Sequence, residues 1–331
     1  MKKIFFVAVA AAVVFASCQK AEQVGLNADQ QEISVLAFNK NMTKGYVTGT
    51  DFKDTAYGEL VKETPITTDR DLVLSAYDAT LKEDYFIGKT FTKKEDKKWT
   101  SDPAIYYPLG GNNLQFLAYS IKDSTPVAEW ENAQKVTLQV IADASKDDIL
   151  YAAAASTAKS QEEAEGKAVS MVFKHAQAWL TVKLSSNIED EATTKPFKVN
   201  SITWKNIYNS GELTIEYGSP AKASWNFFTQ ASKDVEMDDA NRAVKEVTET
   251  PSQLDMLIPE QTAAAFVINY TIGDSTFDYE VPVLKYNEIT KFEMGKHYTF
   301  KLNFTITEIT INPTVTAWVE VEGFDPSPLE L

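Results

Sequence analysis

Tyr298-Thr299-Phe300-Lys301-Leu302-Asn303-Phe304-Thr305-Ile306-Thr307 is the stretch of this chain that decides its fold class. Large apolar side chains occupy every even position, and threonine, lysine or asparagine occupies every odd position. Successive side chains of a β-strand point to opposite faces of its sheet. Ten residues with this alternation therefore predict a strand with one buried and one exposed face.

The same period of two recurs in both directions from this stretch. Shorter alternating segments lie near residues 33–37, 72–76, 114–119, 136–140, 148–151, 180–184 and 277–283. Many short strands separated by turn residues are typical of antiparallel β-sandwiches. A length of 331 residues favours two domains over one. We predict an all-β chain with two antiparallel β-sandwich domains, 18–165 and 166–331, divided in the polar stretch 160–167.

Two segments leave their structure open or depart from the strand pattern. The alanine run at 152–155 fits either a short helix or a loop. The polar segment 231–250 predicts an exposed loop, in part helical.

The first eighteen residues predict export. Lys2 and Lys3 precede an apolar run, Ile4–Phe15, which is of signal-peptide length and short for a membrane span. Ala16-Ser17-Cys18 then matches a lipoprotein signal, with residues 1–17 removed and lipid (palmitate) added at Cys18. The alternative is an ordinary secretion signal with a chance cysteine. Because Cys18 is the only cysteine, no intramolecular disulfide is possible.

Charge excludes some partners. The formal net charge is -15, and removal of Lys2 and Lys3 leaves about -17. An acidic surface of this kind repels nucleic acid and anionic lipid headgroups. We therefore expect no nucleic-acid partner. No metal-ligand spacing and no phosphate-binding loop occurs in the sequence, so we also expect no cofactor.

The last apolar stretch is unusually long. From Ile309 to Val321 the odd positions are almost all aliphatic, including Ile309, Ile311, Val315, Ala317 and Val319. This segment fits the closing strand of a sandwich. It also fits a strand that pairs with another chain, because Pro313 lacks a backbone donor and suits a sheet edge.

Several short motifs together carry a family resemblance. In chain order they are Tyr106-Tyr107-Pro108 with Leu114–Tyr119, then Val172-Phe173-Lys174-His175-Ala176, Leu257-Ile258-Pro259-Glu260, Gly295–Phe300 and Val315-Thr316-Ala317-Trp318. With the lipoprotein signal, they resemble the Bacteroidales fimbrillin family, the FimA-like and Mfa-like pilins of type V pili. The resemblance implies two transthyretin-like β-sandwiches in a non-enzymatic adhesion subunit.

The resemblance also implies a maturation pathway. A lipoprotein precursor on the outer membrane loses its N-terminal segment to a protease that cuts after a basic residue. Mapped here, the removed strand is Ile33–Phe38, with Ile33, Val35 and Ala37 facing inward. The cleavage candidates are Lys44 and Arg70, so the removable part is 18–44 or 18–70. The terminal strand of another subunit then fills the vacated groove by donor-strand exchange, which builds an extracellular fimbrium.

Two other outcomes remain open within the same resemblance. An uncleaved chain would be an anchor subunit that stays lipidated. For a polymerising pilin, the resemblance implies other pilin subunits as partners, together with tip and anchor subunits and an unidentified surface receptor. Short Asp-Ser/Thr motifs make Thr55, Ser124 and Ser275 candidates for O-glycosylation.

A different class of function shares many of these features. A surface lipoprotein that binds glycans would use exposed aromatic residues, drawn from Trp99, Tyr106, Tyr107, Trp130, Trp204 and Trp225. Each of these rings also fits core packing. An enzyme is disfavoured because only His175 and His297 offer an imidazole base, and both fall beside or within predicted strands.

Overall fold

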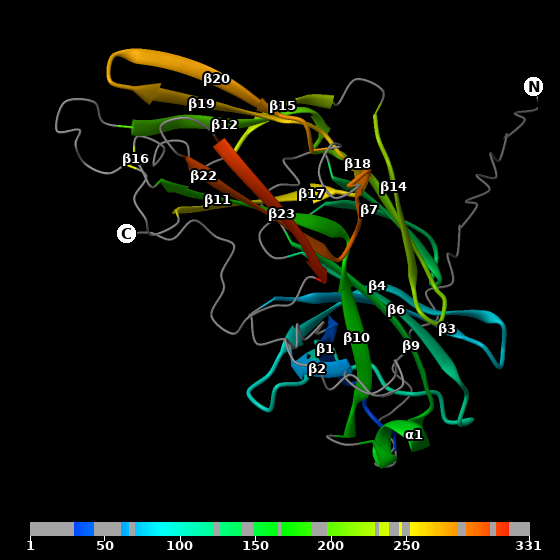
Figure 1. Ribbon diagram of the computed structural model, residues 1–331. Coiled ribbons are helices and arrows are strands. Elements are labelled where there is room, and N and C mark those ends of the chain that lie inside the picture. Colours follow the sequence, from blue (N-terminus) through cyan, green and yellow to red (C-terminus); the bar gives the residue numbers. More distant parts are fainter. Residues whose placement is uncertain are drawn as a thin grey trace, which may run out of the picture. The chain divides into compact units, whose positions relative to one another are not determined.

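A computed structural model provides the structure of the chain. It describes residues 30–42, 61–65, 70–121, 126–140, 148–164, 167–186, 197–228, 232–237, 245–246, 252–283, 289–304 and 309–317. These residues are almost entirely strands, as Figure 1 shows, which confirms the all-β class.

Eight strands of the described chain form the largest sheet. Its order is β10-β9-β6-β3-β4-β5-β1-β2, and β1 also pairs with β10, so the strands from β10 to β1 close into a ring. The strands are β1 (Val35–Met42), β2 (Val61–Pro65), β3 (Leu72–Asp78), β4 (Glu83–Lys93), β5 (Trp99–Ser101), β6 (Leu114–Ile121), β9 (Ile149–Ser156) and β10 (Val169–His175). The ring encloses one core cluster, which includes Val35, Leu74, Phe116 and Phe173.

A four-stranded sheet covers the outside of this ring. It has the order β14-β13-β8-β7, and its strands are β7 (Val127–Asn132), β8 (Lys135–Val140), β13 (Gly211–Glu216) and β14 (Lys222–Asn226). Leu117 and Tyr119 of β6 pack with Leu138 and Leu213 in a second core cluster. Because Phe116 faces the inner cluster, β6 is buried on both faces, which explains its nearly continuous apolar sequence.

The sheet pairings cross the predicted boundary at 165/166. Val169–His175 lies beyond that boundary, yet β10 pairs with β1 and β9 in the large sheet. The β13–β14 hairpin lies beyond it too, and β13 pairs with β8 from Gly211–Val140 to Glu216–Lys135. Sheet membership therefore does not follow the 165/166 boundary. The division of the chain into two domains there stays a prediction.

The remaining strands form a two-layer sandwich. One layer has the order β17-β11-β22-β23, and the other has the order β15-β12-β19-β20 with β16 added to β12. The first layer consists of β11 (Gln177–Ser186), β17 (Ser252–Pro259), β22 (Lys296–Phe304) and β23 (Ile309–Ala317). The second consists of β12 (Phe197–Tyr208), β15 (Ser232–Glu236), β16 (Lys245–Glu246), β19 (Phe266–Ile272) and β20 (Ser275–Val281), and a small pair joins β18 (Gln261–Thr262) to β21 (Lys291–Phe292).

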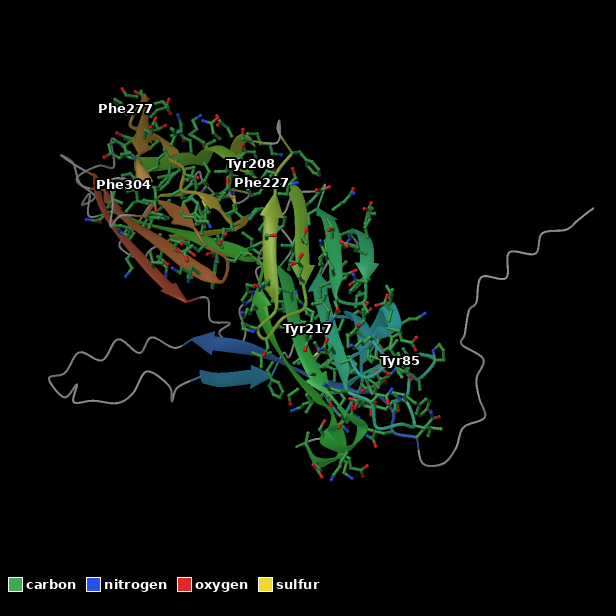
Figure 2. All side chains as sticks on the ribbon, turned by 90° about the vertical axis from the view of Figure 1, so that its right-hand side faces the viewer. Tyr85, Tyr208, Tyr217, Phe227, Phe277 and Phe304 are labelled. Carbon is green, nitrogen blue, oxygen red and sulfur yellow. The ribbon has the colours of Figure 1, made fainter. Side chains whose placement is uncertain are left out.

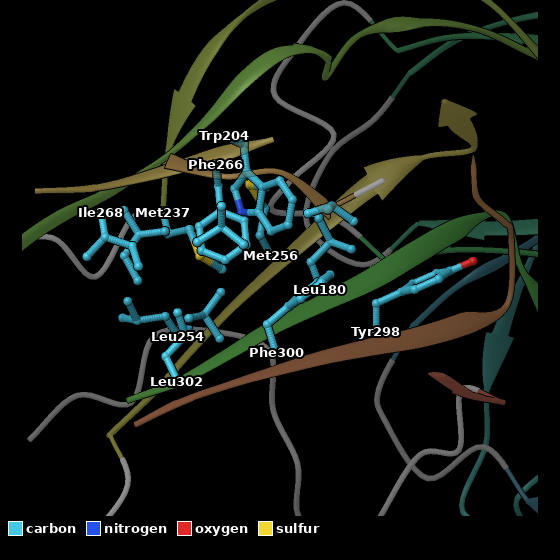
Figure 3. Packing of buried hydrophobic residues seen from close by; sticks show 14 of the residues in the cluster. Leu180, Trp204, Met237, Leu254, Met256, Phe266, Ile268, Tyr298, Phe300 and Leu302 are labelled. Atoms are coloured by element: carbon cyan, nitrogen blue, oxygen red, sulfur yellow. The ribbon is translucent and has the colours of Figure 1, made fainter. Parts of the chain in front are cut away.

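The sandwich core follows directly from the alternation in β22. Tyr298, Phe300, Leu302 and Phe304 are buried in one cluster, and Lys301 between them is exposed. Figure 3 shows Phe300 and Leu302 turned toward Trp204 and Phe266 of the facing layer. The Trp204 and Phe266 ring centroids lie 4.6 Å apart, a separation at which aromatic pairs add to simple area burial.

Two predictions need correction. The alanine run at 152–155 is neither helix nor loop, because it belongs to β9; a short helix, α1 (Ala158–Glu163), follows it behind a capping box at Thr157. The prediction of an exposed, in part helical loop at 231–250 is wrong where the chain is described, because Ser232–Glu236 and Lys245–Glu246 pair with β12. Pairing through the backbone tolerates these polar side chains, which period alone did not anticipate.

Packed aromatic rings link β12 to the β13–β14 hairpin. The rings of Tyr208, at the end of β12, and Phe227, just after β14, are stacked with centroids 4.5 Å apart. Figure 2 labels the two residues next to each other. The Trp225 indole N–H donates to the carbonyl oxygen of Ala176 between β10 and β11. These contacts tie the sandwich to the β7–β14 sheet.

The described residues include neither a membrane-spanning helix nor a metal-binding cluster. No helix there has the length and apolar character needed to cross a membrane. No group of three histidine, cysteine or acidic side chains there is arranged to hold a metal ion.

Candidate assembly site

The first strand lies between neighbours that are distant in sequence. β1 pairs in parallel with β10 from Val35–Val169 to Asn39–Phe173, and in antiparallel with β2 from Phe38–Pro65 onward. Val35 also pairs with Trp99 of β5, on the same edge of β1 that pairs with β2 further along. Figure 1 shows β1 and β2 in blue beside the green β10. Without β1, the β10 edge would lack its partner.

The three residues predicted to face inward from this strand do so. Ile33 and Val35 are fully buried and Ala37 is 2% exposed, all within the core of the ring. Met171 and Phe173 of β10 are in the same cluster. Full burial of Ile33 and Val35 contributes about 1.5–3 kcal/mol each, so loss of the strand would expose a substantial apolar groove.

The sequence did not predict that Gln161 hydrogen-bonds the backbone just before this strand. Gln161 of α1 is 1% exposed. Its side-chain amide donates to the carbonyl oxygen of Glu32 at 2.7 Å and accepts from the Ser34 amide at 3.4 Å. A lone glutamine in a polar stretch gives no signal of this role, because its partners lie 127 to 129 residues earlier.

The terminal strand lies at a sheet edge. β23 pairs with β22 alone in the sheet order, from Lys296–Ala317 to Phe304–Ile309. Ile311 is partly buried against the sandwich core, whereas Val315 is 40% exposed. Nothing is described of the side chains of Ile309 and Ala317, and Val319 lies outside the described residues.

The two cleavage candidates differ sharply. Lys44 lies outside the described residues. The side chain of Arg70 is only 2% exposed, and its guanidinium contacts the Asp148 carboxylate at 3.3 Å and the Asp148 carbonyl oxygen at 3.1 Å. Arg70 is therefore a buried, paired residue and not a solvated loop residue. Its side chain is not available to a protease in this fold.

Asp148 joins Arg70 to one of the two histidines. His175 Nδ1 lies 2.8 Å from the second Asp148 carboxylate oxygen. Burial alone would raise the pKa of Asp148, but the His175 ring and the Arg70 guanidinium outweigh it and hold that pKa below its usual value. Arg70, Asp148 and His175 thus contact one another inside the protein, while Arg70 Nε is buried without a hydrogen-bond partner in the described part of the chain.

The second histidine packs on the outer face of the β17-β11-β22 layer. Its ring stacks on Trp179 with centroids 3.8 Å apart, and its Nε2 lies 2.7 Å from the Thr181 hydroxyl. Asp255 accepts from the Trp179 indole N–H at 2.9 Å and from Thr181. Burial lowers the pKa of His297 to about 4, while Asp255 opposes this shift and Lys183 adds to it.

Most of the candidate glycan-binding rings are unavailable. Trp99, Tyr107 and Trp204 are at most 1% exposed and belong to the cores. Trp130 and Trp225 are partly buried and pack against the cluster between β6 and β8. Tyr106 pairs through its backbone with Glu32. These placements agree with core packing for Trp99, Tyr107 and Trp204 and with partial burial for Trp130 and Trp225.

Of the residues predicted to carry lipid or sugar, only Ser275 lies in the described part of the chain. Cys18, Thr55 and Ser124 lie outside the described residues. Ser275 is exposed at the start of β20, directly after the Gly273-Asp274 turn. Its accessibility is compatible with glycosylation, which stays a prediction.

The fold and the site together define a class: an all-β structural protein whose first strand is internal to a core and whose last strand lies at an edge. Two solved structures share the fold, both of proteins assigned to cell adhesion. The one from Bacteroides uniformis is 11% identical, with a TM-score of 0.58 over 89% of this chain and 100% of its own. The one from Bacteroides ovatus is 12% identical, with a TM-score of 0.56 over 88% of this chain and 99% of its own.

Sequence comparison places the chain in a family. A profile of fimbrillin-like proteins matches residues 28–318, and the chain belongs to this family. A search of curated proteins gave no significant match. Family membership confirms the resemblance seen in the short motifs and identifies a structural, non-enzymatic protein of the cell surface.

Proposed function

We propose that this chain is a pilus subunit that polymerises by donor-strand exchange. Its lipidated N-terminal segment, β1 included, is removed, and the terminal strand of another subunit takes the place of β1. The observation that carries this proposal is the contrast between the two strands. The inward side chains of β1 are buried, while β23 is an edge strand with Val315 40% exposed.

The physics of the groove favours replacement over an empty site. Removal of β1 would leave the β10 edge without its hydrogen-bond partners and would expose Met171 and Phe173 to water. Unpaired backbone groups and bare apolar surface are both costly. A strand with aliphatic side chains at alternate positions would pair the backbone groups again and cover the apolar surface. Contacts that run head to tail without closing then give a filament.

Lys44 is the better supported cleavage site. It lies between β1 and β2, so cleavage there frees β1 on its C-terminal side. Arg70 is held in a buried ion pair, and cleavage after it would also remove β2. We therefore assign 18–44 as the segment that is removed from a precursor lipidated at Cys18 on the outer membrane.

The partners follow from this scheme. The main partner is another copy of the chain, and tip and anchor subunits would end the fibre.

The first test is the N-terminal sequence and mass of protein sheared from the surface of cells that express it. We expect an N-terminus at Gly45 in material that runs as an SDS-resistant ladder. An N-terminus at Asp71 would support strand exchange and overturn the choice of Lys44. An acylated Cys18 on a monomer would contradict polymerisation and leave an anchor subunit or a glycan-binding lipoprotein.

A matched pair of variants sharpens the test. Lys44→Gln should abolish the ladder and leave an acylated precursor, whereas Lys53→Gln, a change at another lysine between β1 and β2, should leave the ladder intact. Equal ladders from both variants would show that cleavage does not depend on Lys44.

A further inference from the structure

The hairpin between β4 and β5 is a positive patch on an acidic chain. Residues 89–98 contain Lys89, Lys93, Lys94, Lys97 and Lys98 against only Glu95 and Asp96, a local excess of three positive charges. The whole chain has a formal net charge of -15. A cluster of this sign is therefore a local exception and calls for an anionic partner.

The hairpin is ordered, and part of its charge is free. The Lys94 amide donates to the Lys98 carbonyl oxygen at 2.7 Å, and the Lys97 amide donates to the Lys94 carbonyl oxygen at 2.9 Å. Lys98 pairs with Asp96 at 3.2 Å. Lys94 and Lys97 are exposed and form no ion pair within the described part of the chain. Two lysines of a fixed turn are thus available to a partner.

The hairpin borders the groove that β1 occupies. Trp99 of β5 pairs with Val35 of β1. The ammonium of Lys93 lies 5.5 Å from the centroid of the Trp99 ring, which packs in the same core as Val35. The β4–β5 turn that carries Lys94 and Lys97 ends at Lys98, directly before Trp99. The turn therefore adjoins the end of the groove at which Val35 pairs.

The segment that follows the terminal strand has the opposite charge. Residues 318–331 contain Glu320, Glu322, Asp325 and Glu330 and neither lysine nor arginine. If Ala317 takes the place of Ala37, the small inward position of β1, Glu320 lies three residues away in either strand direction. That is about 10 Å along the strand from the Ala37 position, at 3.3 Å per residue.

We propose that the lysine hairpin, Lys94 and Lys97 above all, is a docking surface for the acidic segment after β23 of a second copy of this chain. The inference rests on donor-strand exchange as proposed above and adds an electrostatic step to it. The hairpin captures residues 320–325 of the incoming subunit before the apolar side chains enter the groove. Charges at the rim of an interface mainly affect the rate of association.

A charge-swap experiment in cells tests the proposal. Full-length chains carrying Lys94→Glu/Lys97→Glu, or Glu320→Lys/Glu322→Lys, are compared for the rate at which SDS-resistant ladders form after a pulse label. Each pair should slow ladder formation about five- to tenfold. The four changes combined should restore the rate to within about twofold, because attraction returns with its signs exchanged.

A control with the same change of net charge separates docking from general charge effects. Lys222→Glu/Lys233→Glu reverses two exposed lysines on β14 and β15 and should leave the rate within about twofold. Urea unfolding of each purified precursor, and N-terminal sequencing of each mature chain, verify that folding and cleavage are unchanged.

The outcomes are distinct. An unchanged rate in the hairpin variant, or a combined variant no faster than the two single pairs, overturns the docking surface and leaves donor-strand exchange intact. No ladder from the unaltered chain would contradict donor-strand exchange, and the docking inference would fall with it.

Discussion

At the scale of the residue, two histidine sites show how burial sets chemistry. His175 lies in a buried ion network with Arg70 and Asp148, whereas His297 is stacked on Trp179 and kept neutral by burial. Neither histidine has the exposed, poised arrangement of a general base. Both make buried contacts within the fold.

Loss of the Arg70 guanidinium should be costly. Arg70→Gln leaves Asp148 buried with one cation fewer, and removal of one member of a buried pair typically destabilises by about 3–5 kcal/mol. We expect a fall of this size in the free energy of unfolding, measured by urea titration at pH 7. Lys89→Gln, on the exposed face of β4, should change it by less than about 0.5 kcal/mol. A loss below about 1 kcal/mol at Arg70 would show that the network is not stabilising.

His297 should make stability depend on pH. Its pKa is about 4 in the folded state against 6.5 for the free side chain, so the unfolded chain binds more protons between these values. Stability from His297 is therefore full above pH 6.5 and is lost as the pH falls toward 4. The gap in unfolding free energy between the unaltered chain and His297→Asn should narrow from pH 7 to pH 5. Parallel pH curves for the two proteins would refute this.

At the scale of the element, the position of a strand in its sheet separates its two possible roles. β1 pairs on both sides, and its inward side chains are buried; β23 pairs on one side, and only part of its apolar face is covered. No described register pair joins β1 to β23 within one chain. In the proposed exchange, β23 of one subunit would take the place of β1 in another.

Two substitutions in β23 should separate polymerisation from folding. Val315→Asp changes a side chain that is 40% exposed, so the stability of the unpolymerised chain should fall by less than about 1 kcal/mol. The same carboxylate in an apolar groove would be desolvated, and the ladder should disappear. Ile311→Asp alters a side chain packed on the sandwich core and should reduce both stability and ladder. A normal ladder from Val315→Asp would argue against β23 as the donor.

At the scale of the whole molecule, the sheets do not follow the order of the chain. β10 and the β13–β14 hairpin come after residue 165 but pair with strands that precede it. The Tyr208–Phe227 stack and the hydrogen bond from Trp225 to Ala176 tie β12 and the start of β11 to this arrangement. Folding of the first half is therefore expected to depend on the second.

A fragment of residues 31–165 should fail to fold alone. It lacks β10, β13 and β14, so Leu138 and Val35 lose partners in their clusters. Circular dichroism and amide proton dispersion should show no cooperative structure, while the 31–331 chain unfolds in a cooperative transition. Cooperative unfolding of the 31–165 fragment would instead support a domain boundary at 165.

Local patterns in the sequence were enough to predict many of the strands and the burial of Ile33, Val35 and Ala37. The side-chain period of two is a property of a few adjacent residues, so Tyr298–Phe304 could be read without knowledge of its neighbours. The predicted strand near 277–283 shows the limit of such reading, because Phe277 is 45% exposed although Val281 and Val283 are buried. Alternation defines two faces but not how far the facing sheet extends.

The sequence by itself determined the all-β class, the positions of many strands and the family. Only the tertiary structure decided that Arg70 is buried against Asp148, that Gln161 holds the start of β1, and that β13 joins β8. Arg70 and Asp148 are 78 positions apart, and Gln161 and its partner Glu32 are 129 positions apart. Sheet neighbours are chosen by backbone hydrogen bonds and core packing over the whole chain, and backbone groups carry no side-chain signal. For that reason the strands could be read from the sequence, but their partners could not.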